Sequence, residues 1–220
     1  MTRVTIVDYL GNLGSVSRAL EWLGAEPEVT DEPEKIAAAG HLILPGDGAF
    51  GYGMQQLRDK ELVEPLLEFI ASGKPFLGIC VGMQLLLSES EEFGHHEGLG
   101  VIPGRVVPFP PDSGAGKSFK VPHIGWSFLH SPNGSSNGPA SVPQAWEGTI
   151  LADLHAGESV YFVHSFLAVP TDPQHRLADS EYGGETVCAV VGKGNVTGCQ
   201  FHPEKSGPVG LRILKRFVES

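Results

Sequence analysis

The sequence of 220 residues has few cysteines, few basic residues and no long hydrophobic run. Cys80, Cys188 and Cys199 are an odd number without C-x-x-C spacing, which argues against both a disulfide framework and a zinc site. Lysine and arginine number 15 against 26 acidic residues, and the net charge of −11 excludes the cationic surface that a nucleic-acid partner needs. The longest apolar run, residues 76–87, is shorter than the roughly 20 residues that cross a bilayer, so no membrane partner is expected.

The amino terminus and the histidines also lack the patterns of targeting and metal binding. Asp8 interrupts the first apolar stretch before a signal-peptide region of adequate length forms, and a reducing cytoplasm is the expected location. His95, His96 and Glu97 are adjacent, and adjacent residues rarely ligate one ion together. Because residues 89–92 are mostly acidic, this segment is interpreted as a solvated acidic turn. We therefore expect neither a metal ion nor a cofactor.

The first half of the chain predicts an α/β fold. Short apolar runs at residues 4–7, 41–44 and 75–79 read as strands, and they alternate with helical apolar stripes at residues 13–23 and 62–70. Such alternation is typical of parallel strands joined by crossover helices. The last of these runs is almost wholly apolar, as expected for a central strand that is covered on both faces.

The second half predicts strands joined by turns and a closing helix. The candidate strands are residues 101–107, 160–163, 186–191 and 196–200, and the helical stripe spans residues 210–218. Antiparallel or mixed pairing is expected because long helices do not separate these strands. No clean domain boundary is visible, so residues 1–220 are predicted to form one domain. Residues 130–143 are too polar and glycine-rich to bury themselves and are predicted to form an exposed loop insertion.

Gly78-Ile79-Cys80-Val81-Gly82 predicts a nucleophile on a strained turn. This G-x-C-x-G segment follows a buried strand and precedes a helical pattern at residues 83–87, which is the strand-turn-helix arrangement of a nucleophile elbow with cysteine in place of serine. The helix N-terminus would favour the thiolate, and the Val81 N–H would face a developing oxyanion. A small buried cysteine in a tight turn is the alternative interpretation. Cys188 and Cys199 lie inside apolar strand patterns and are expected in the core.

Two further segments supply candidates for a base and for substrate binding. His202 and Glu204 follow a predicted strand and point to the same side of an extended chain, so the carboxylate would orient the imidazole toward a thiol. Gly46, Asp47 and Gly48 end another strand and would supply oxyanion N–H groups or hold an amino-acid substrate. Alone, that segment is simply a turn. Open α/β sheets place their sites at the carboxyl ends of strands, where all these residues are predicted to lie.

Five segments, taken in order, carry a resemblance to a known family: PGDGAF, GICVGMQ, KVPHIGW, YFVHSF and QFHPEKSG. GICVGMQ and FHPE resemble class I, or triad, glutamine amidotransferases. KVPHIGW and HPEKSG narrow the resemblance to the amidotransferase subunits of imidazole glycerol phosphate synthases, and it covers nearly the whole chain. It implies a single-domain class I glutamine amidotransferase-like fold, whose central, mostly parallel sheet is flanked by helices and carries additional antiparallel strands in the C-terminal half.

The resemblance implies a glutaminase in which Cys80 attacks the glutamine carboxamide, His202 moves the proton and Glu204 orients His202. A thioester forms and is hydrolysed, which gives glutamate and ammonia. The residues expected to bind glutamine are Gly46, Gly48, Gln84, His164, Ser165 and Phe166, and those expected at the oxyanion are Asp47, Gly48 and Val81.

The expected partner is a (β/α)8 cyclase subunit in a heterodimer. In the family this subunit uses the ammonia to make imidazole glycerol phosphate, for histidine synthesis, and an aminoimidazole carboxamide ribotide. Asn12, Trp126 and Lys205 resemble positions that face it. Two positions depart from the family pattern, because Asp47 replaces an apolar residue and Ser127 replaces asparagine. A carboxylate at position 47 would either oppose negative charge at the oxyanion or simply point to solvent.

Two other functions remain open from the residues alone. One is a stand-alone Cys-His-Glu hydrolase that acts on another amide or ester. The other is a non-catalytic binding module on the same fold, against which the intact Cys80, His202 and Glu204 count. Release of glutamate from glutamine would distinguish the glutaminase from the stand-alone hydrolase.

Overall fold

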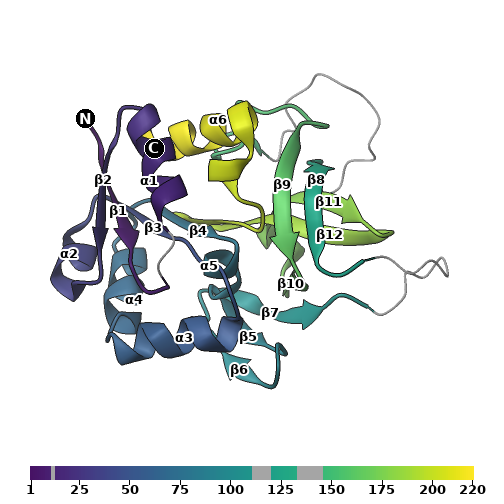
Figure 1. The fold of residues 1–220 in the computed structure, drawn as a ribbon, viewed down its shortest axis with the longest axis horizontal. Coiled ribbons are helices and arrows are strands. Elements are labelled where there is room, and N and C mark those ends of the chain that lie inside the picture. Colours follow the sequence, from purple (N-terminus) through teal and green to yellow (C-terminus); the bar gives the residue numbers. More distant parts are fainter. Residues whose placement is uncertain (11–12, 111–119, 133–145) are drawn as a thin grey trace.

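The computed structural model describes residues 1–10, 13–110, 120–132 and 146–220, which are drawn as ribbon in Figure 1. Most of the loop insertion predicted at residues 130–143 lies outside these described residues, as does Asn12. Among the residues described, no helix is long and apolar enough to span a membrane.

The centre of the molecule is a seven-stranded sheet in the order β11-β12-β13-β4-β3-β1-β2. The five strands from β13 to β2 are parallel, and β11 and β12 continue the sheet in antiparallel pairing. The mostly parallel sheet with antiparallel strands from the C-terminal half is thus confirmed. The bounds are β1 Arg3–Val7, β2 Glu26–Thr30, β3 His41–Leu44, β4 Phe76–Ile79, β11 Arg176–Tyr182, β12 Glu185–Lys193 and β13 Val196–Cys199.

Helices cover both faces of this sheet (Figure 1). α1 (Gly14–Trp22) and α6 (Gly207–Val218) pack together on one face. α2 (Pro33–Ala38), α3 (Phe50–Asp59) and α4 (Val63–Ala71) lie on the other. Every residue of β4 is buried as a result, which explains its continuous apolar sequence.

Two smaller sheets stand beside the central one. The first has the order β10-β7-β5-β6, and the second is the antiparallel pair β8-β9. Their bounds are β5 Leu87–Ser90, β6 His96–Glu97, β7 Ile102–Pro108, β8 His123–Phe128, β9 Ser159–His164 and β10 Phe166–Pro170. Two short 3-10 helices follow, η2 at Pro173–His175 and η3 at Pro203–Lys205.

The helix predicted at residues 83–87 is wrong in its extent. α5 spans Val81–Gln84, and Leu87 already belongs to β5, where it is the register partner of Ile102. Three consecutive leucines fit a buried helix or a buried strand equally well, and pairing with β7 decides between the two.

Three adjacent strands of the central sheet end at the same edge and carry the predicted motifs. β3 leads into Pro45 and Gly46, β4 leads into Cys80, and β13 leads into Gln200 and His202. Because these parallel strands lie side by side in the order β13-β4-β3, their carboxyl ends bring the three segments together.

Candidate active site

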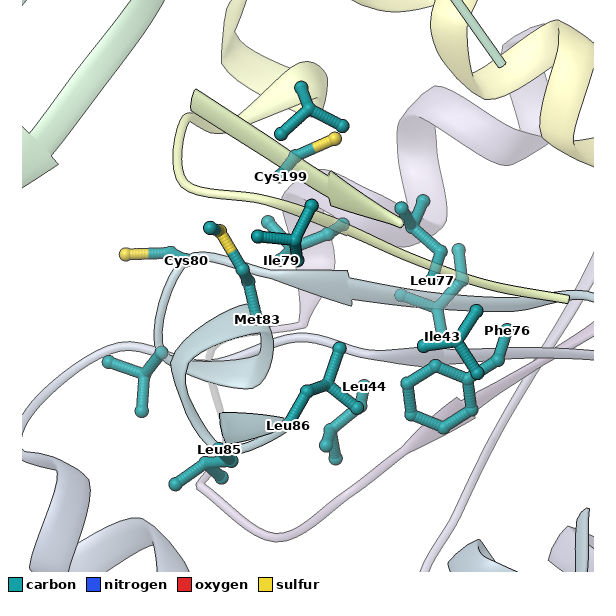
Figure 2. Close-up of a cluster of buried hydrophobic side chains, with 14 of the residues drawn as sticks. Ile43, Leu44, Phe76, Leu77, Ile79, Cys80, Met83, Leu85, Leu86 and Cys199 are labelled. Carbon is teal, nitrogen blue, oxygen red and sulfur yellow. The ribbon is translucent and has the colours of Figure 1, made fainter. Parts of the chain in front are cut away.

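Cys80 occupies the turn between β4 and α5 in a backbone conformation that is rare for a side chain other than glycine. Its φ is 54° and its ψ is −112°, and its N–H donates to the Cys199 carbonyl at 2.7 Å. A Cβ atom on Gly78 would lie 2.7 Å from the Gly82 carbonyl oxygen, and one on Gly82 would overlap the Leu44 carbonyl. The flanking glycines are therefore required by close backbone packing, which is the geometry predicted for a nucleophile elbow. Figure 2 shows the Cys80 side chain at the end of β4, pointing away from the surrounding hydrophobic cluster.

The other two cysteines lie in the core, as predicted. Cys188 and Cys199 are buried and belong to β12 and β13. Burial raises the pKa of the Cys188 thiol to about 12 and that of Cys199 further still. A thiol that stays protonated is a poor nucleophile, so Cys80 is the remaining candidate nucleophile among the three cysteines.

His202 and Glu204 form the pair that the sequence predicts. The His202 Nδ1 atom lies 2.8 Å from the Glu204 Oε1 atom, and both side chains are almost completely buried. The His202 N–H donates to the Tyr161 carbonyl on β9 at 3.0 Å, which fixes the backbone of this segment. With Nδ1–H donating to the carboxylate, Nε2 is left for proton exchange with Cys80.

The surroundings of His202 stabilise its protonated form. Burial opposes the charge, but the Cys80 sulfur and the Glu204 carboxylate outweigh it and raise the pKa of His202 to about 10. A protonated imidazole beside the nucleophile is a group that can donate a proton to a leaving nitrogen.

A pocket of about 250 Å³ opens in front of the sulfur. Its walls combine residues from all the predicted binding segments: Asp47, Gly48, Cys80, Val81, Gln84, His164, Ser165, Phe166 and His202. Gly46 and Glu204 line a small second cavity behind His202 instead. The candidate catalytic and binding residues thus converge on one place, and among the described residues no group of three histidines, cysteines or carboxylates is arranged to hold a metal ion.

Trp126 and Lys205, two of the residues expected at the partner interface, lie outside the pocket. Trp126 is on β8, is 56% exposed and contacts the Tyr161 ring edge-on at 5.9 Å. Lys205 is exposed at the end of η3, directly after Glu204. Both side chains are therefore accessible to another molecule.

Glu92 also lines the pocket, and the sequence analysis missed it. Its interpretation as part of a solvated acidic turn is wrong, because Glu92 is buried and its carboxylate accepts a hydrogen bond from the Phe50 N–H at 2.6 Å, at the start of α3. Burial raises the pKa of this carboxyl group, while the Phe50 N–H and His96 partly offset the effect. Residues 89–92 contain three glutamates and one serine, and this uniformly polar segment does not reveal that Glu92 faces inward.

His164, which is expected to bind glutamine, lies on the pocket wall and pairs with a second histidine, His123, that the sequence did not indicate. The His123 Nδ1 atom lies 3.0 Å from the His164 Nε2 atom, the His123 Nε2 atom lies 3.0 Å from the Ser127 Oγ atom, and the His164 Nδ1 atom lies 2.9 Å from the Phe166 carbonyl. Burial lowers the pKa of His123 to about 4 and that of His164 to about 3, so both rings are neutral. The Phe166 carbonyl only accepts, which makes His164 its donor, His123 the donor to His164, and the Ser127 hydroxyl the donor to His123. Ser127 thus has a defined partner.

The chain matches the family model of glutamine amidotransferase class-I over residues 4–220. It is 49% identical over 220 residues to the imidazole glycerol phosphate synthase subunit HisH 1 of Legionella pneumophila, with both chains covered completely. It is 50% identical over 216 residues to the imidazole glycerol phosphate synthase subunit HisH of Syntrophotalea carbinolica, which covers 97% of this chain and 98% of that relative.

Solved structures show the same fold at lower identity. A crystal structure of a glutamine amidotransferase superimposes with a TM-score of 0.70 at 19% identity and covers 98% of this chain and 97% of that one. The structure of PurLQS from Thermotoga maritima gives a TM-score of 0.69 at 22% identity and covers 99% and 98%. The chain therefore belongs to the class I glutamine amidotransferase family and, within that family, to the HisH subunits of imidazole glycerol phosphate synthase.

Proposed function

We propose that this chain is the glutaminase subunit of an imidazole glycerol phosphate synthase, which hydrolyses L-glutamine and supplies ammonia to a cyclase subunit in histidine biosynthesis. The observation that carries the proposal is that Cys80 and His202 line one pocket at the carboxyl edge of the sheet, while Glu204 is hydrogen-bonded to the other side of the His202 ring. One chain supplies all three groups, so the proposed chemistry needs no residue from another subunit.

The first half of the reaction forms a thioester. The Cys80 sulfur attacks the carboxamide carbon of glutamine, and the carbonyl oxygen takes up the negative charge while it faces the Val81 N–H and the turn at Gly46, Asp47 and Gly48. The His202 imidazolium gives its Nε2 proton to the leaving nitrogen, the C–N bond breaks and ammonia departs. Glu204 keeps its hydrogen bond to Nδ1 throughout and stabilises the charge on the ring.

The second half releases glutamate. His202, now neutral, accepts a proton from a water molecule that attacks the thioester carbon. The C–S bond then breaks, and the sulfur leaves as the thiolate beside the reprotonated imidazolium. The strong preference of this site for a charged His202 favours that final state.

Glutamine carries an ammonium and a carboxylate besides the amide, and the pocket offers groups for both. Glu92 is a buried carboxylate on the pocket wall, suited to the ammonium group. Gln84 and the segment of His164, Ser165 and Phe166 supply polar groups around the remainder of the substrate. The wall thus combines two acidic groups, Glu92 and Asp47, with neutral polar groups, and a zwitterion needs partners of both kinds.

An apolar surface beside the pocket supports docking of the cyclase subunit. On β8, Ile124, Trp126 and Phe128 alternate outward and are 58%, 56% and 66% exposed. Their register partners on β9 include Val163, whose carbonyl lies 3.7 Å from the Cys80 sulfur. A partner that covers this surface would lie next to the site where ammonia is released.

The deciding experiment is the rate of glutamate release with and without the cyclase subunit and its nucleotide ligand. We expect weak turnover by the isolated chain and faster turnover in the complex. Cys80→Ala is expected to abolish glutamine-dependent synthesis and to spare synthesis that is driven by added ammonia. No glutamate release under any of these conditions would refute the glutaminase function, and loss of the ammonia-driven reaction in Cys80→Ala would refute Cys80 as the nucleophile.

A further inference from the structure

Gln200 has no exposed surface and lies between the nucleophile and a residue of the pocket wall. It directly follows β13, and its N–H donates to the Ala189 carbonyl of β12 at 2.9 Å, so its backbone belongs to the rigid sheet. Its side-chain Nε2 atom lies 3.8 Å from the Cys80 sulfur, and its Oε1 atom lies 2.9 Å from the Gln84 Nε2 atom. A buried amide thus bridges the sulfur and Gln84.

The hydrogen-bond network fixes which end of the Gln200 amide faces the sulfur. The Gln84 Nε2 atom also lies 3.4 Å from the Phe166 carbonyl, which only accepts hydrogen bonds, so this end of Gln84 is its NH2 group. The atom of Gln200 that faces the same NH2 group must then be its oxygen. Its own NH2 group is consequently directed at Cys80.

Sequence spacing places Gln200 and His202 on the same side of the chain. In an extended segment residues i and i+2 share a face, and Phe201 between them points into the core, where it packs edge-on against Phe162 at 5.7 Å. Both Gln200 and His202 are therefore directed at the sulfur, one with a neutral N–H donor and the other with a charged ring. A thiolate accepts hydrogen bonds more strongly than a thiol, and a buried N–H group without an acceptor is costly.

We propose that Gln200 is a further catalytic residue: its side-chain NH2 group donates to the Cys80 thiolate, and its oxygen is held in place by Gln84 on the pocket wall. The inference rests on the proposed glutaminase function and deepens it. It assigns the thiolate two donors, His202 and Gln200, before the sulfur attacks glutamine and again when the sulfur leaves the thioester. Because Gln84 holds the Gln200 oxygen and also lines the pocket, the orientation of the Gln200 NH2 group depends on the pocket wall that contacts substrate.

The test is Gln200→Glu, which removes the donor and keeps an oxygen acceptor for Gln84. The rate of Cys80 alkylation by iodoacetamide is measured against pH, together with kcat and KM for glutamine in the complex with the cyclase subunit. We expect the alkylation midpoint to rise by about one pH unit or more and kcat to fall about tenfold or more, with a small change in KM. The matched control Gln55→Glu makes the same chemical change on the exposed surface of α3 and is expected to change neither quantity.

An unchanged alkylation midpoint in Gln200→Glu would overturn the proposal, whatever the effect on kcat, because a purely structural role would leave the thiolate unaffected. Alkylation does not require glutamine turnover, so failure of the glutaminase function and failure of this inference give different results. If the variant does not fold, the unmodified protein supplies the second measurement. The NMR signals of the Gln200 side-chain NH2 group are expected to shift with the same pH midpoint as Cys80 alkylation, and signals that stay constant would overturn the proposal.

Discussion

Gly46 packs against the nucleophile turn at a distance that excludes any side chain. A Cβ atom at this position would lie 2.5 Å from the Tyr9 hydroxyl oxygen, 2.9 Å from the Gly82 nitrogen and 3.0 Å from the Val81 Cβ atom. Gly48, two residues later, has a φ of 97°, which only glycine adopts without strain. The turn that is proposed to face the oxyanion is therefore held by close packing at Gly46 and by backbone conformation at Gly48.

Gly46→Ala is expected to lower kcat for glutamine hydrolysis by about 10² to 10³, the usual effect of losing one oxyanion donor. The methyl group would push the turn away from Val81 and move its N–H groups out of line with the reacting oxygen. Steady-state glutaminase assays in the presence of the cyclase subunit measure the effect. The matched control is Gly40→Ala, because a Cβ atom at Gly40 would meet nothing within 4 Å. Equal kcat values for the two variants would show that the turn does not act in catalysis.

The pair of strands β8 and β9 is joined internally by two buried histidines that remain neutral. The His123 ring stacks on Phe162 at 4.8 Å and on Tyr182 at 3.9 Å, and it donates to His164 across the two strands. Charging either ring would break this donor order and place a cation in a buried stack. The element that carries Trp126 on its outer surface therefore depends on neutral histidines on its inner surface.

Acid is expected to destabilise the protein through this pair. In the unfolded chain both histidines have a pKa near 6.5, whereas in the folded protein burial lowers the pKa of His123 to about 4 and that of His164 to about 3. Below pH 6.5 the unfolded state binds more protons, so the free energy of unfolding falls by about 1.4 kcal/mol per pH unit for each histidine. His202 acts in another window, because its raised pKa gives stabilisation that is complete below pH 6.5 and is lost toward pH 10.

The measurement is urea denaturation between pH 6.5 and pH 5 for the unmodified protein and His123→Phe. Phenylalanine preserves the stack on Phe162 and Tyr182 and removes one titrating group, so the dependence on pH is expected to become shallower. His95→Phe is the control, since His95 is exposed and lies outside the pair. Equal slopes for all three proteins would contradict the role of His123.

The local sequence predicts a strand where apolar residues lie in the apolar interior of the sheet. β1, β3 and β4 are short apolar runs that lie inside the sheet, and the sequence predicts all three. β2 has the sequence EPEVT, whose charges and proline suit the edge of a sheet but do not signal a strand, and it forms because it pairs with β1.

Site residues are likewise predictable only where the local sequence carries a distinctive pattern. Cys80, His202 and Glu204 are predictable because their motifs need a particular residue type at a particular spacing. Glu92 and Gln200 are not, since an acidic run and a lone glutamine are common on surfaces. Their burial results from contacts with Phe50 and Cys80, which are 42 and 120 residues away along the chain.

At the scale of the whole molecule, a strongly acidic chain carries an apolar face beside its active site. The net charge is −11, yet Ile124, Trp126 and Phe128 stand together on the outer side of β8 with no charged residue between them. Single exposed apolar side chains are ordinary on protein surfaces, but three on one strand form a contiguous patch. Such a patch is typical of the core of a protein interface, where tryptophan contributes most to affinity.

Trp126→Ala is accordingly expected to weaken the affinity for the cyclase subunit by about tenfold or more, which corresponds to about 1.4 kcal/mol. Tyr52→Ala serves as the control, because Tyr52 is similarly exposed at 59% but lies on α3 (Figure 1). Isothermal titration calorimetry with the purified cyclase subunit measures both. If Trp126→Ala and Tyr52→Ala bind equally well, the partner docks elsewhere. If only Trp126→Ala binds weakly, the partner docks on the strand pair whose inner surface holds the neutral histidines and whose Val163 carbonyl lies beside the Cys80 sulfur.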